Sequence, residues 1–443
     1  MFAAPRFIAV DDNPSHLNAI VETFQRLGSP CLGIHYDPAE DMDAAHFSGV
    51  RVLFLDLHLL GSGAGTDDTK HYANIVSILQ STISVEGGPF ILVLWTQFPE
   101  KAQALTEYLD SSITPEFAHA RPLTVMPLAK SDFINTDSGE IVDDGGLRRW
   151  VKESLAGNVQ MQALVGWEHD VVRAAGRTLS SLVSLIPAES RVTAKFAGEL
   201  DLLLSRLAIA AVGTHNVSDD ARAAVNAVLA PILADRVLNQ DEPEGSVEVW
   251  SRAVTRVGTR DPGPPDEKVK GAINRSLHIA VPASEKIMPD GWGAVCAAPS
   301  TIVSDKGLGL LFGLNRKSLL SDEFAVQDRD LDRAVFRLVR IGAACDYAQR
   351  RPGPIAYVLA IELSSAAKFR GKAKDALWRS PTILLEDTNE PVRLRVNCRF
   401  MITRTSKAVQ RWTVCYRLRE QLLVELINHA ADYASRPGII SLN

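Results

Sequence analysis

Short apolar runs alternate with segments of helical periodicity through the first third of the chain. Pro14–Leu27 carries apolar side chains at helical intervals. The apolar runs are continuous rather than alternating, which is typical of strands that helices cover on both faces. They lie at Arg6–Val10, Pro30–His35, Val50–Leu55, Phe90–Trp95 and Leu123–Met126. The pattern predicts an α/β fold with a doubly wound, parallel, five-stranded sheet.

The pattern becomes helical from about residue 146. Three amphipathic segments, rich in Ala and Leu, occupy Leu147–Leu185, Thr193–Ala211 and Asp219–Leu238. A Pro/Gly turn cluster at Gly258–Asp266 (GTRDPGPPD) then predicts a boundary. We therefore expect a helical connector at 146–265, with the α/β domain before it at 1–145.

Strand signals dominate the last part of the chain after a helix at Glu267–His278. The predicted strands are Ala294–Val303, Ala356–Leu363, Thr382–Leu385, Val392–Thr403 and Trp412–Tyr416. A helix at Leu418–Tyr433 closes the pattern before Pro437-Gly438. Residues 266–443 are thus predicted to form an α+β, strand-rich domain.

Composition and charge agree with this division into separate domains. The 443 residues are 46% hydrophobic and 23% charged, which is ordinary for a globular protein. Residues 1–145 hold 7 Lys and Arg against 20 Asp and Glu, a net charge of −13, whereas residues 331–443 hold 19 against 10, a net charge of +9. The apolar runs are too short to span a bilayer, and no secretion signal is visible. We expect a cytoplasmic protein with no membrane span and, from five widely spaced cysteines, no disulfide framework.

Polar side chains stand where the predicted parallel strands end. They are Asp11, Asp12, Asp56, Thr96 and Lys130. In an open parallel sheet the carboxyl ends of the strands carry the functional groups. Three neighbouring carboxylates need a compensating cation, and Mg²⁺ prefers such oxygen ligands. A carboxylate, a hydroxyl and a lysine in this arrangement suit phosphoryl transfer.

The segments FIAVDD, VLFLDLHL, LVLWTQ and MPLAKSDF resemble the receiver domain of two-component response regulators, over about residues 5–145. The resemblance implies a flavodoxin-like fold, and Mg²⁺ bound by Asp11 and Asp12 together with Asp56. It implies that Asp56 accepts a phosphoryl group from a histidine kinase or phosphotransfer protein. By the same resemblance, Thr96 and Lys130 would sense and hold that group. The chain is thus predicted to be a response-regulator-like signalling protein whose receiver controls a C-terminal output domain.

Several residues depart from the family pattern. Gln97 replaces a small residue, Ser131 replaces a proline, and the spacing predicts insertions at Gly61–Tyr72 and Glu107–Arg121. A degenerate receiver that acts as a protein-interaction adaptor, for example in a bacterial conflict or phage-defence assembly, is therefore an alternative. Asp11 and Asp12 taken alone also fit a helix N-cap before Pro14. The glycine-rich stretch 61–70 lacks the spacing of a phosphate-binding loop.

The basic rear domain offers a further candidate surface. Arg393, Arg395, Arg399 and Arg404 follow one another at short intervals, with aromatic residues among them. Such residues are typical of an anion or nucleic-acid surface, so a phospho-regulated nucleic-acid-binding protein is a second alternative. The same residues also fit a solvated strand face that balances the acidic front domain. A homodimer through the helical connector is a further prediction.

Overall fold

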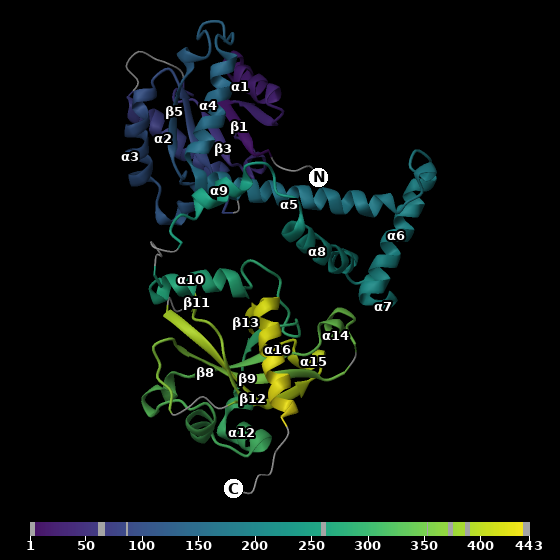
Figure 1. Ribbon diagram of the computed structural model, residues 1–443. Helices are drawn as coiled ribbons and strands as arrows, with labels where there is room; N and C mark the ends of the chain where they lie inside the picture. The colour runs from purple at the N-terminus through teal and green to yellow at the C-terminus, as the bar shows by residue number, and fades with distance from the viewer. Residues whose placement is uncertain are drawn as a thin grey trace. The chain divides into compact units, whose positions relative to one another are not determined.

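The computed structural model describes residues 5–60, 67–85, 87–257, 263–351, 353–370, 375–385 and 390–436. Residues 61–66 lie outside these residues, which removes most of the glycine-rich stretch 61–70 and half of the predicted insertion at Gly61–Tyr72. Residues 258–262 of the Pro/Gly cluster at Gly258–Asp266 lie outside them as well. The chain forms two compact units (Figure 1). Unit 1 comprises Met1–Asp170 and Glu242–Thr255, and unit 2 comprises Val171–Asp241 and Arg256–Asn443. The predicted division at 1–145, 146–265 and 266–443 stays a prediction.

Unit 1 is built on a five-stranded sheet in which every neighbouring pair is parallel. The strands are β1 (Phe7–Asp11), β2 (Cys31–His35), β3 (Val52–Leu55), β4 (Ile91–Thr96) and β5 (Val125–Ala129). Their spatial order is β2-β1-β3-β4-β5. The predicted parallel α/β sheet is therefore confirmed, and its order is consistent with a flavodoxin-like fold. The last strand begins two residues later than the sequence predicted.

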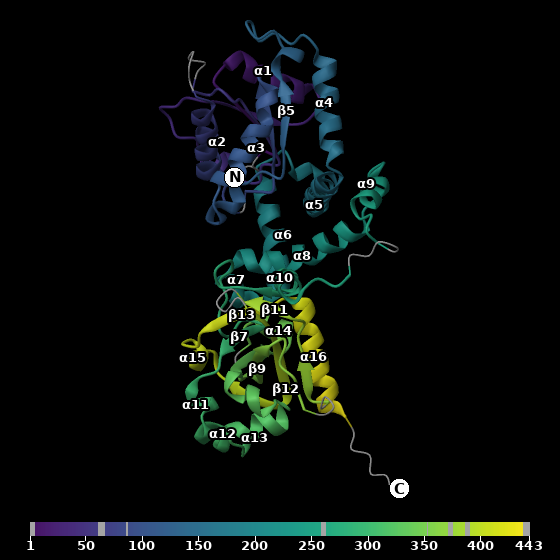
Figure 2. The same cartoon turned by 90° about the vertical axis from the view of Figure 1, so that its left-hand side faces the viewer.

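Helices cover both faces of this sheet (Figure 2). They are α1 (Pro14–Arg26), α2 (Asp68–Thr82), α3 (Ala102–Ser112) and α4 (Asp144–Gly157). One buried cluster joins α2 and α3 to strand residues such as Leu55 and Leu92, and a second joins α1 to their alternate neighbours Phe54 and Ile91. Leu147 of α4 and Met161 of α5 (Val159–Ser184) extend the second cluster. Burial on both faces explains why these strands read as continuous apolar runs.

Unit 2 contains a curled antiparallel sheet of eight strands. They are β6 (Ile279–Ala280), β7 (Ala294–Ala297), β8 (Val335–Ile341), β9 (Ile355–Ser364), β10 (Leu377–Arg379), β11 (Ile383–Leu385), β12 (Glu390–Arg404) and β13 (Val414–Leu418). Helix α16 (Glu420–Ser435) packs on one face, where Leu423 and Leu426 are fully buried. The strand-rich rear half is thus confirmed. Strand β8 was not predicted, because Arg337 and Arg340 interrupt its apolar residues.

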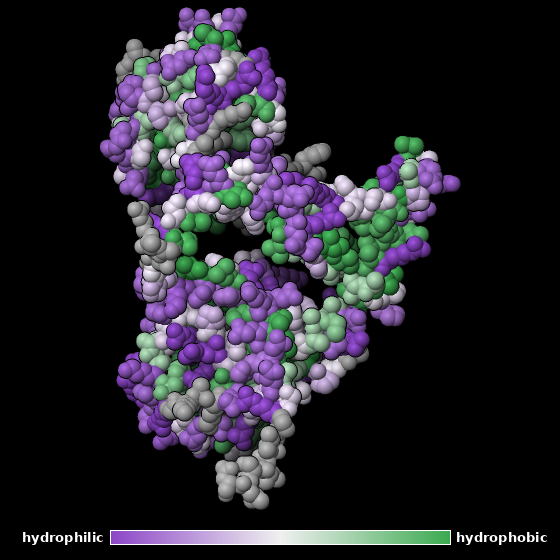
Figure 3. Space-filling view, in the orientation of Figure 1, coloured by the Kyte–Doolittle hydropathy of each residue, from purple (hydrophilic) through white to green (hydrophobic). Residues whose placement is uncertain are grey.

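Two other features of unit 2 bear on the predictions. The segment predicted as one strand from Ala294 divides into β7 and the short helix α11 (Ser300–Val303), because Pro299 precedes the helix. Helices α6 (Lys195–Val212) and α8 (Ala221–Asn239) share a core of only three buried residues and expose apolar side chains, including Leu202 and Ile209 on α6 (Figure 3). The homodimer through this region stays a prediction.

None of the helices in the described part of the chain combines the length and apolarity that a bilayer crossing needs.

The loop after β5 returns to the start of α1 and packs closely against it. Gly139 in this loop has φ of +75°, and a Cβ atom there would lie 2.3 Å from the Cβ of Ser15. Gly28 has nearly the same φ, +72°, but nothing within 4 Å of the corresponding position. Both residues therefore need a left-handed backbone, and only Gly139 also needs the absence of a side chain.

We expect Gly139→Ala to destabilise the loop and strand β1 by about 1–3 kcal/mol more than Gly28→Ala, because an added methyl group must displace well-packed backbone. Hydrogen exchange measured by mass spectrometry on peptides that cover β1 and residues 130–141 checks this. Equal protection in the two variants would show that Gly139 does not make this close contact.

Candidate functional site

The carboxyl edge of the parallel sheet gathers the polar residues that the sequence singled out. Asp11 is the last residue of β1 and Asp12 follows it, Asp56 follows β3, and Lys130 follows β5. Since β1 and β3 are parallel neighbours, their ends meet, and the Asp56 amide donates to the Val10 carbonyl oxygen (3.1 Å). The side chain of Lys130 reaches this point from β5, two strands away from β3 in the sheet.

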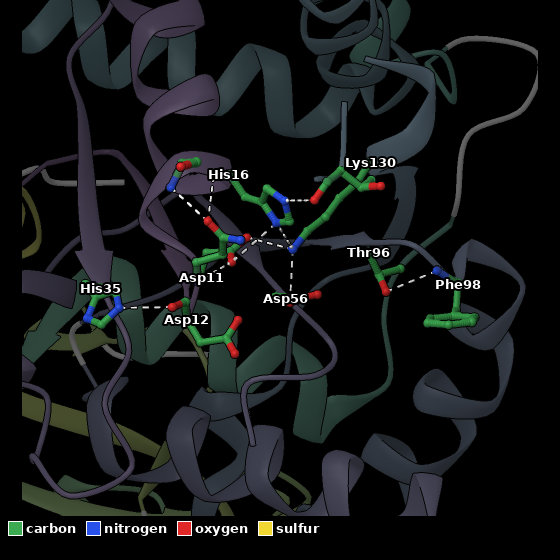
Figure 4. A network of polar contacts seen from close by, with 11 residues as sticks. Asp11, Asp12, His16, His35, Asp56, Thr96, Phe98 and Lys130 are labelled. Atoms are coloured by element: carbon green, nitrogen blue, oxygen red, sulfur yellow. Dashed lines mark hydrogen bonds and ion pairs between the residues drawn. The ribbon is translucent and has the colours of Figure 1, made fainter. Parts of the chain in front are cut away.

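Lys130 is the centre of the cluster (Figure 4). Its Nζ lies 2.8 Å from Oδ2 of Asp11 and 3.0 Å from Oδ2 of Asp56. The Nδ1 atom of His16 lies 3.2 Å from the same Nζ. Lys130 is 2% exposed and Asp11 is 1% exposed, so these ion pairs are buried. A lysine in this position requires such partners, because an unpaired buried ammonium is very costly.

The cluster contains three aspartates but only one lysine. Burial raises the pKa of Asp11, and the charge of Asp56 raises it further, although the attraction of Lys130 acts in the opposite direction. Asp12 is partly exposed, and its carboxylate makes no hydrogen bond or ion pair to any residue that the structure describes. The cluster therefore has unbalanced negative charge, which a bound cation would relieve.

The three carboxylates fit a metal ion. Each of Asp11, Asp12 and Asp56 offers one oxygen, and these atoms lie within 4.8 Å of one another. Oxygen ligands at about 2.1 Å from Mg²⁺ lie about 3.0 to 4.2 Å apart in an octahedron, which small side-chain rotations would reach from here. The structure thus provides an acidic cluster that could bind a metal ion.

A cavity of about 230 Å³ opens beside the cluster. Its lining comes from four segments: Asp12, Asn13, His16, Asp56, His58, Gln97, Phe98, Lys130 and Thr136. The cavity is larger than a phosphoryl group needs. It lies directly beside Asp56, whose Oδ1 makes no hydrogen bond to the residues that the structure describes.

Thr96 lies at the end of β4 but does not line this cavity. It is fully buried, and its hydroxyl accepts a hydrogen bond from the Phe98 amide (3.2 Å). No contact joins its Oγ1 to Asp56 or Lys130 among the described residues. Gln97 and Phe98 face the cavity instead. The structure therefore gathers four of the five predicted residues around one point and places Thr96 beside them, with its hydroxyl occupied by the following turn.

Two histidines of the site were not found by sequence reasoning. His16 lies in the first turn of α1, and its ring reaches Lys130. His58, two residues after Asp56, packs edge-on against His71 and Phe98, with ring centroids 4.6 and 5.0 Å apart. Burial and the neighbouring His71 lower the pKa of His58. Neither histidine has another histidine at a spacing typical of metal ligands. In the sequence, only their positions shortly after the aspartates at the strand ends could have indicated that they belong to the site.

The four predicted surface arginines of the rear domain all lie on β12: Arg393, Arg395, Arg399 and Arg404. Arg395 is only 6% exposed, and its guanidinium carbon lies 3.8 Å from the ring centroid of Phe369. Burial and the nearby Arg379 lower the pKa of Arg395 to about 10. This arginine is therefore part of the packed interior of unit 2.

The other three arginines have different surroundings. Arg393 donates to the hydroxyl of Thr382 (3.0 Å), and Arg399 forms an ion pair with Glu323 (3.1 Å). Arg404 is partly buried and donates to its neighbouring backbone carbonyl (2.8 Å). Three of the four thus contact other segments of unit 2, and nucleic-acid binding by this strand stays a prediction.

Comparison with known proteins identifies no relative of this chain. No protein-family model matches the chain, and neither a curated protein nor a solved structure is significantly similar to it.

We expect Lys130→Met to make unit 1 more dependent on divalent cations. Without the ammonium, three carboxylates share the pocket with no balancing charge, so added Mg²⁺ should raise the melting temperature of this variant more than that of the unsubstituted chain. Lys101→Met is the matched control, because Lys101 pairs with Asp68 at a partly exposed position. A Mg²⁺-induced shift in Lys130→Met no larger than in the control would contradict this account of the cluster.

The raised pKa of Asp11 predicts how metal binding depends on pH. Its carboxyl takes up a proton at a higher pH than an ordinary aspartate, whose pKa is 3.8. Since only the carboxylate binds a metal ion, Mg²⁺-induced stabilisation should decline as the pH is lowered, and the decline should begin above the range of ordinary aspartates. Thermal unfolding with and without Mg²⁺ from about pH 7 to about pH 4 measures this. A shift that stays constant over that range would contradict it.

Proposed function

We propose that unit 1 is a receiver-like phosphoacceptor domain that takes a phosphoryl group on Asp56 from a phosphohistidine donor. The observation that carries the proposal is the buried pairing of Lys130 with both Asp11 and Asp56, at 2.8 and 3.0 Å, at the carboxyl edge of a parallel sheet. A structural ion pair needs one carboxylate for one lysine. Two buried acids, a third acid that is partly exposed and an adjoining cavity suit a reaction in which a charged group binds and is released.

In the proposed step an oxygen of Asp56 attacks the phosphorus of the donor. The new O–P bond forms as the P–N bond of the phosphohistidine breaks, and the donor imidazole leaves and takes up a proton from solvent. Lys130 neutralises the charge that develops on the phosphoryl oxygens, because its Nζ already lies 3.0 Å from Asp56. The cavity beside Asp56 admits the phosphoryl group.

Mg²⁺ is the cofactor we propose for this site, held by Asp11, Asp12 and Asp56. When bound, it would supply positive charge to the phosphoryl oxygens and bring the three carboxylates together without mutual repulsion. The partly exposed carboxylate of Asp12 is the group through which the ion would enter, since the other two acids are buried.

Phosphorylation would act on the rest of the chain through the loops around the cavity. The phosphorylated side chain of Asp56 would carry about two negative charges at neutral pH, where the free carboxylate carries one. That charge would draw Lys130 away from Asp11 and reorganise the loop that follows β5, which is a local switch of the kind that receivers couple to an output. The partner that supplies the group would be a histidine kinase or a phosphotransfer protein.

One observation favours the second candidate, a degenerate receiver that acts as an adaptor. Gln97 lines the cavity and is larger than the small residue that the family pattern has at this position. Phe98 lines the cavity beside it. If they exclude the phosphoryl group, the acidic edge would serve only to bind a partner protein. Labelling of the chain by a phosphodonor distinguishes the two candidates.

We expect incubation with acetyl phosphate or phosphoramidate and Mg²⁺ to place an acid-stable, base-labile phosphoryl group on Asp56. Asp56→Asn should abolish the label, because an amide is not a nucleophile toward phosphorus. Asp110→Asn is the matched control, since Asp110 lies on α3 and pairs with Arg121. Borohydride trapping followed by mass spectrometry identifies the labelled residue.

Retention of the label in Asp56→Asn would overturn the assignment of the acceptor. Absence of any label in the unsubstituted chain, together with Mg²⁺-dependent stabilisation, would favour the adaptor.

A further inference from the structure

We infer that His16 is a positioning residue for Lys130 and fixes the direction in which its ammonium group points. This inference rests on the proposed function and adds a residue that the receiver resemblance does not supply. His16 is 5% exposed and lies in the first turn of α1. Its ring lies between the side chain of Lys130 and the backbone of Thr136.

The hydrogen bonds determine the tautomer of the ring. The Nε2 atom lies 2.9 Å from the carbonyl oxygen of Thr136, which can only accept, so Nε2 carries the proton. In the neutral ring Nδ1 then has a free lone pair. That lone pair accepts from the ammonium of Lys130, whose Nζ is 3.2 Å away. Thr136 therefore sets the ring so that it presents an acceptor to Lys130.

The ring itself is held by the start of α1. The side chain of Asn13 accepts hydrogen bonds from the backbone amides of Ser15 (2.9 Å) and His16 (3.4 Å), and Pro14 occupies the first turn. This cap fixes the position of the His16 backbone directly after β1. The backbone that carries the acceptor is thus fixed by the capped start of α1.

The contact between His16 and Lys130 matters for the reaction. An ammonium group has three N–H donors, and the Nζ of Lys130 has three acceptors within 3.2 Å: Asp11, Asp56 and His16. The two carboxylates would exchange Lys130 for the metal ion and the phosphoryl group. His16 takes part in neither exchange, so its contact can persist and keep the ammonium aimed at Asp56 throughout.

A purely structural role is the competing explanation, because His16 also joins α1 to the loop after β5 through Thr136. Two substitutions separate the roles. In His16→Asn the amide oxygen lies near the position of Nδ1 and can accept from Lys130. In His16→Gln the amide nitrogen lies near the position of Nε2 and can donate to Thr136.

We expect the rate of Asp56 labelling by acetyl phosphate with Mg²⁺ to stay within about threefold of the unsubstituted chain in His16→Asn. It should fall by about tenfold or more in His16→Gln, which loses a hydrogen bond to a charged group. The opposite order would show that His16 acts by holding the loop, and equal rates in both variants and the unsubstituted chain would show that it does not position Lys130. Either result overturns the inference.

A second measurement does not depend on phosphorylation. In the full chain with ¹⁵N-labelled histidine, the Nδ1 resonance of His16, assigned by its loss in His16→Asn, should indicate an unprotonated nitrogen and shift in Lys130→Met. A protonated Nδ1, or a resonance unchanged by Lys130→Met, would overturn the pairing itself. If the unsubstituted chain takes no label while the resonance behaves as expected, the proposed function fails and the pairing of His16 with Lys130 stands as a structural contact only.

Discussion

One ammonium group buried among acidic side chains holds together the carboxyl edge of unit 1, where we propose that the chemistry takes place. Lys130 lies 2.8 Å from Asp11 and 3.0 Å from Asp56, almost without exposure to water. Burying these charges separately would be very unfavourable, so the folded state must bring all of them to one place. The parallel sheet does this by ending β1, β3 and β5 at the same edge, with the order β2-β1-β3-β4-β5.

Unit 2 also buries an acidic side chain, but there the charge of the acid is paired. Glu362 on β9 is 4% exposed, and each of its carboxylate oxygens has a partner: Arg337 at 2.6 Å and the hydroxyl of Tyr416 at 2.7 Å. Burial raises the pKa of Tyr416 well above its usual range, so it remains a neutral donor. Such a network stabilises one arrangement of the strands. The acidic edge of unit 1 instead retains negative charge, which is why we assign the chemistry to unit 1.

The acidic edge could be predicted from the sequence because each of its residues is recognisable from the residues next to it in the chain. Asp11, Asp56 and Lys130 each follow a recognisable apolar run, and the parallel arrangement of those runs is enough to bring the three residues together. His16 and Gly139 could not be found in this way, because their roles depend on how the loop after β5 packs against α1. The position of the Thr96 hydroxyl, which accepts from Phe98, depends on the backbone of a single turn.

The rear half was harder to interpret for a related reason. This antiparallel sheet joins strands that are distant in the sequence. Charged residues inside its strands interrupt the apolar runs by which a strand is recognised in the sequence. Strand β8 lies between β7 and β9 in the sheet, yet it contains Arg337 and Arg340. The arginines of β12 also appeared equivalent in the sequence, whereas Arg395 is buried against an aromatic ring and Arg399 pairs with Glu323. Only the packing distinguishes them.

Asp11, Asp12, Asp56 and Lys130 lie together in one pocket that could bind a divalent cation. Anomalous diffraction from crystals of the full chain soaked in Mn²⁺, which shares the oxygen preference of Mg²⁺, tests it most directly. We expect a manganese peak bound by the three aspartates, with the Nζ of Lys130 still beside Asp56. Dispersed carboxylates, or an acidic edge that binds no manganese while Lys130 points away from it, would show that these residues form no such cation site.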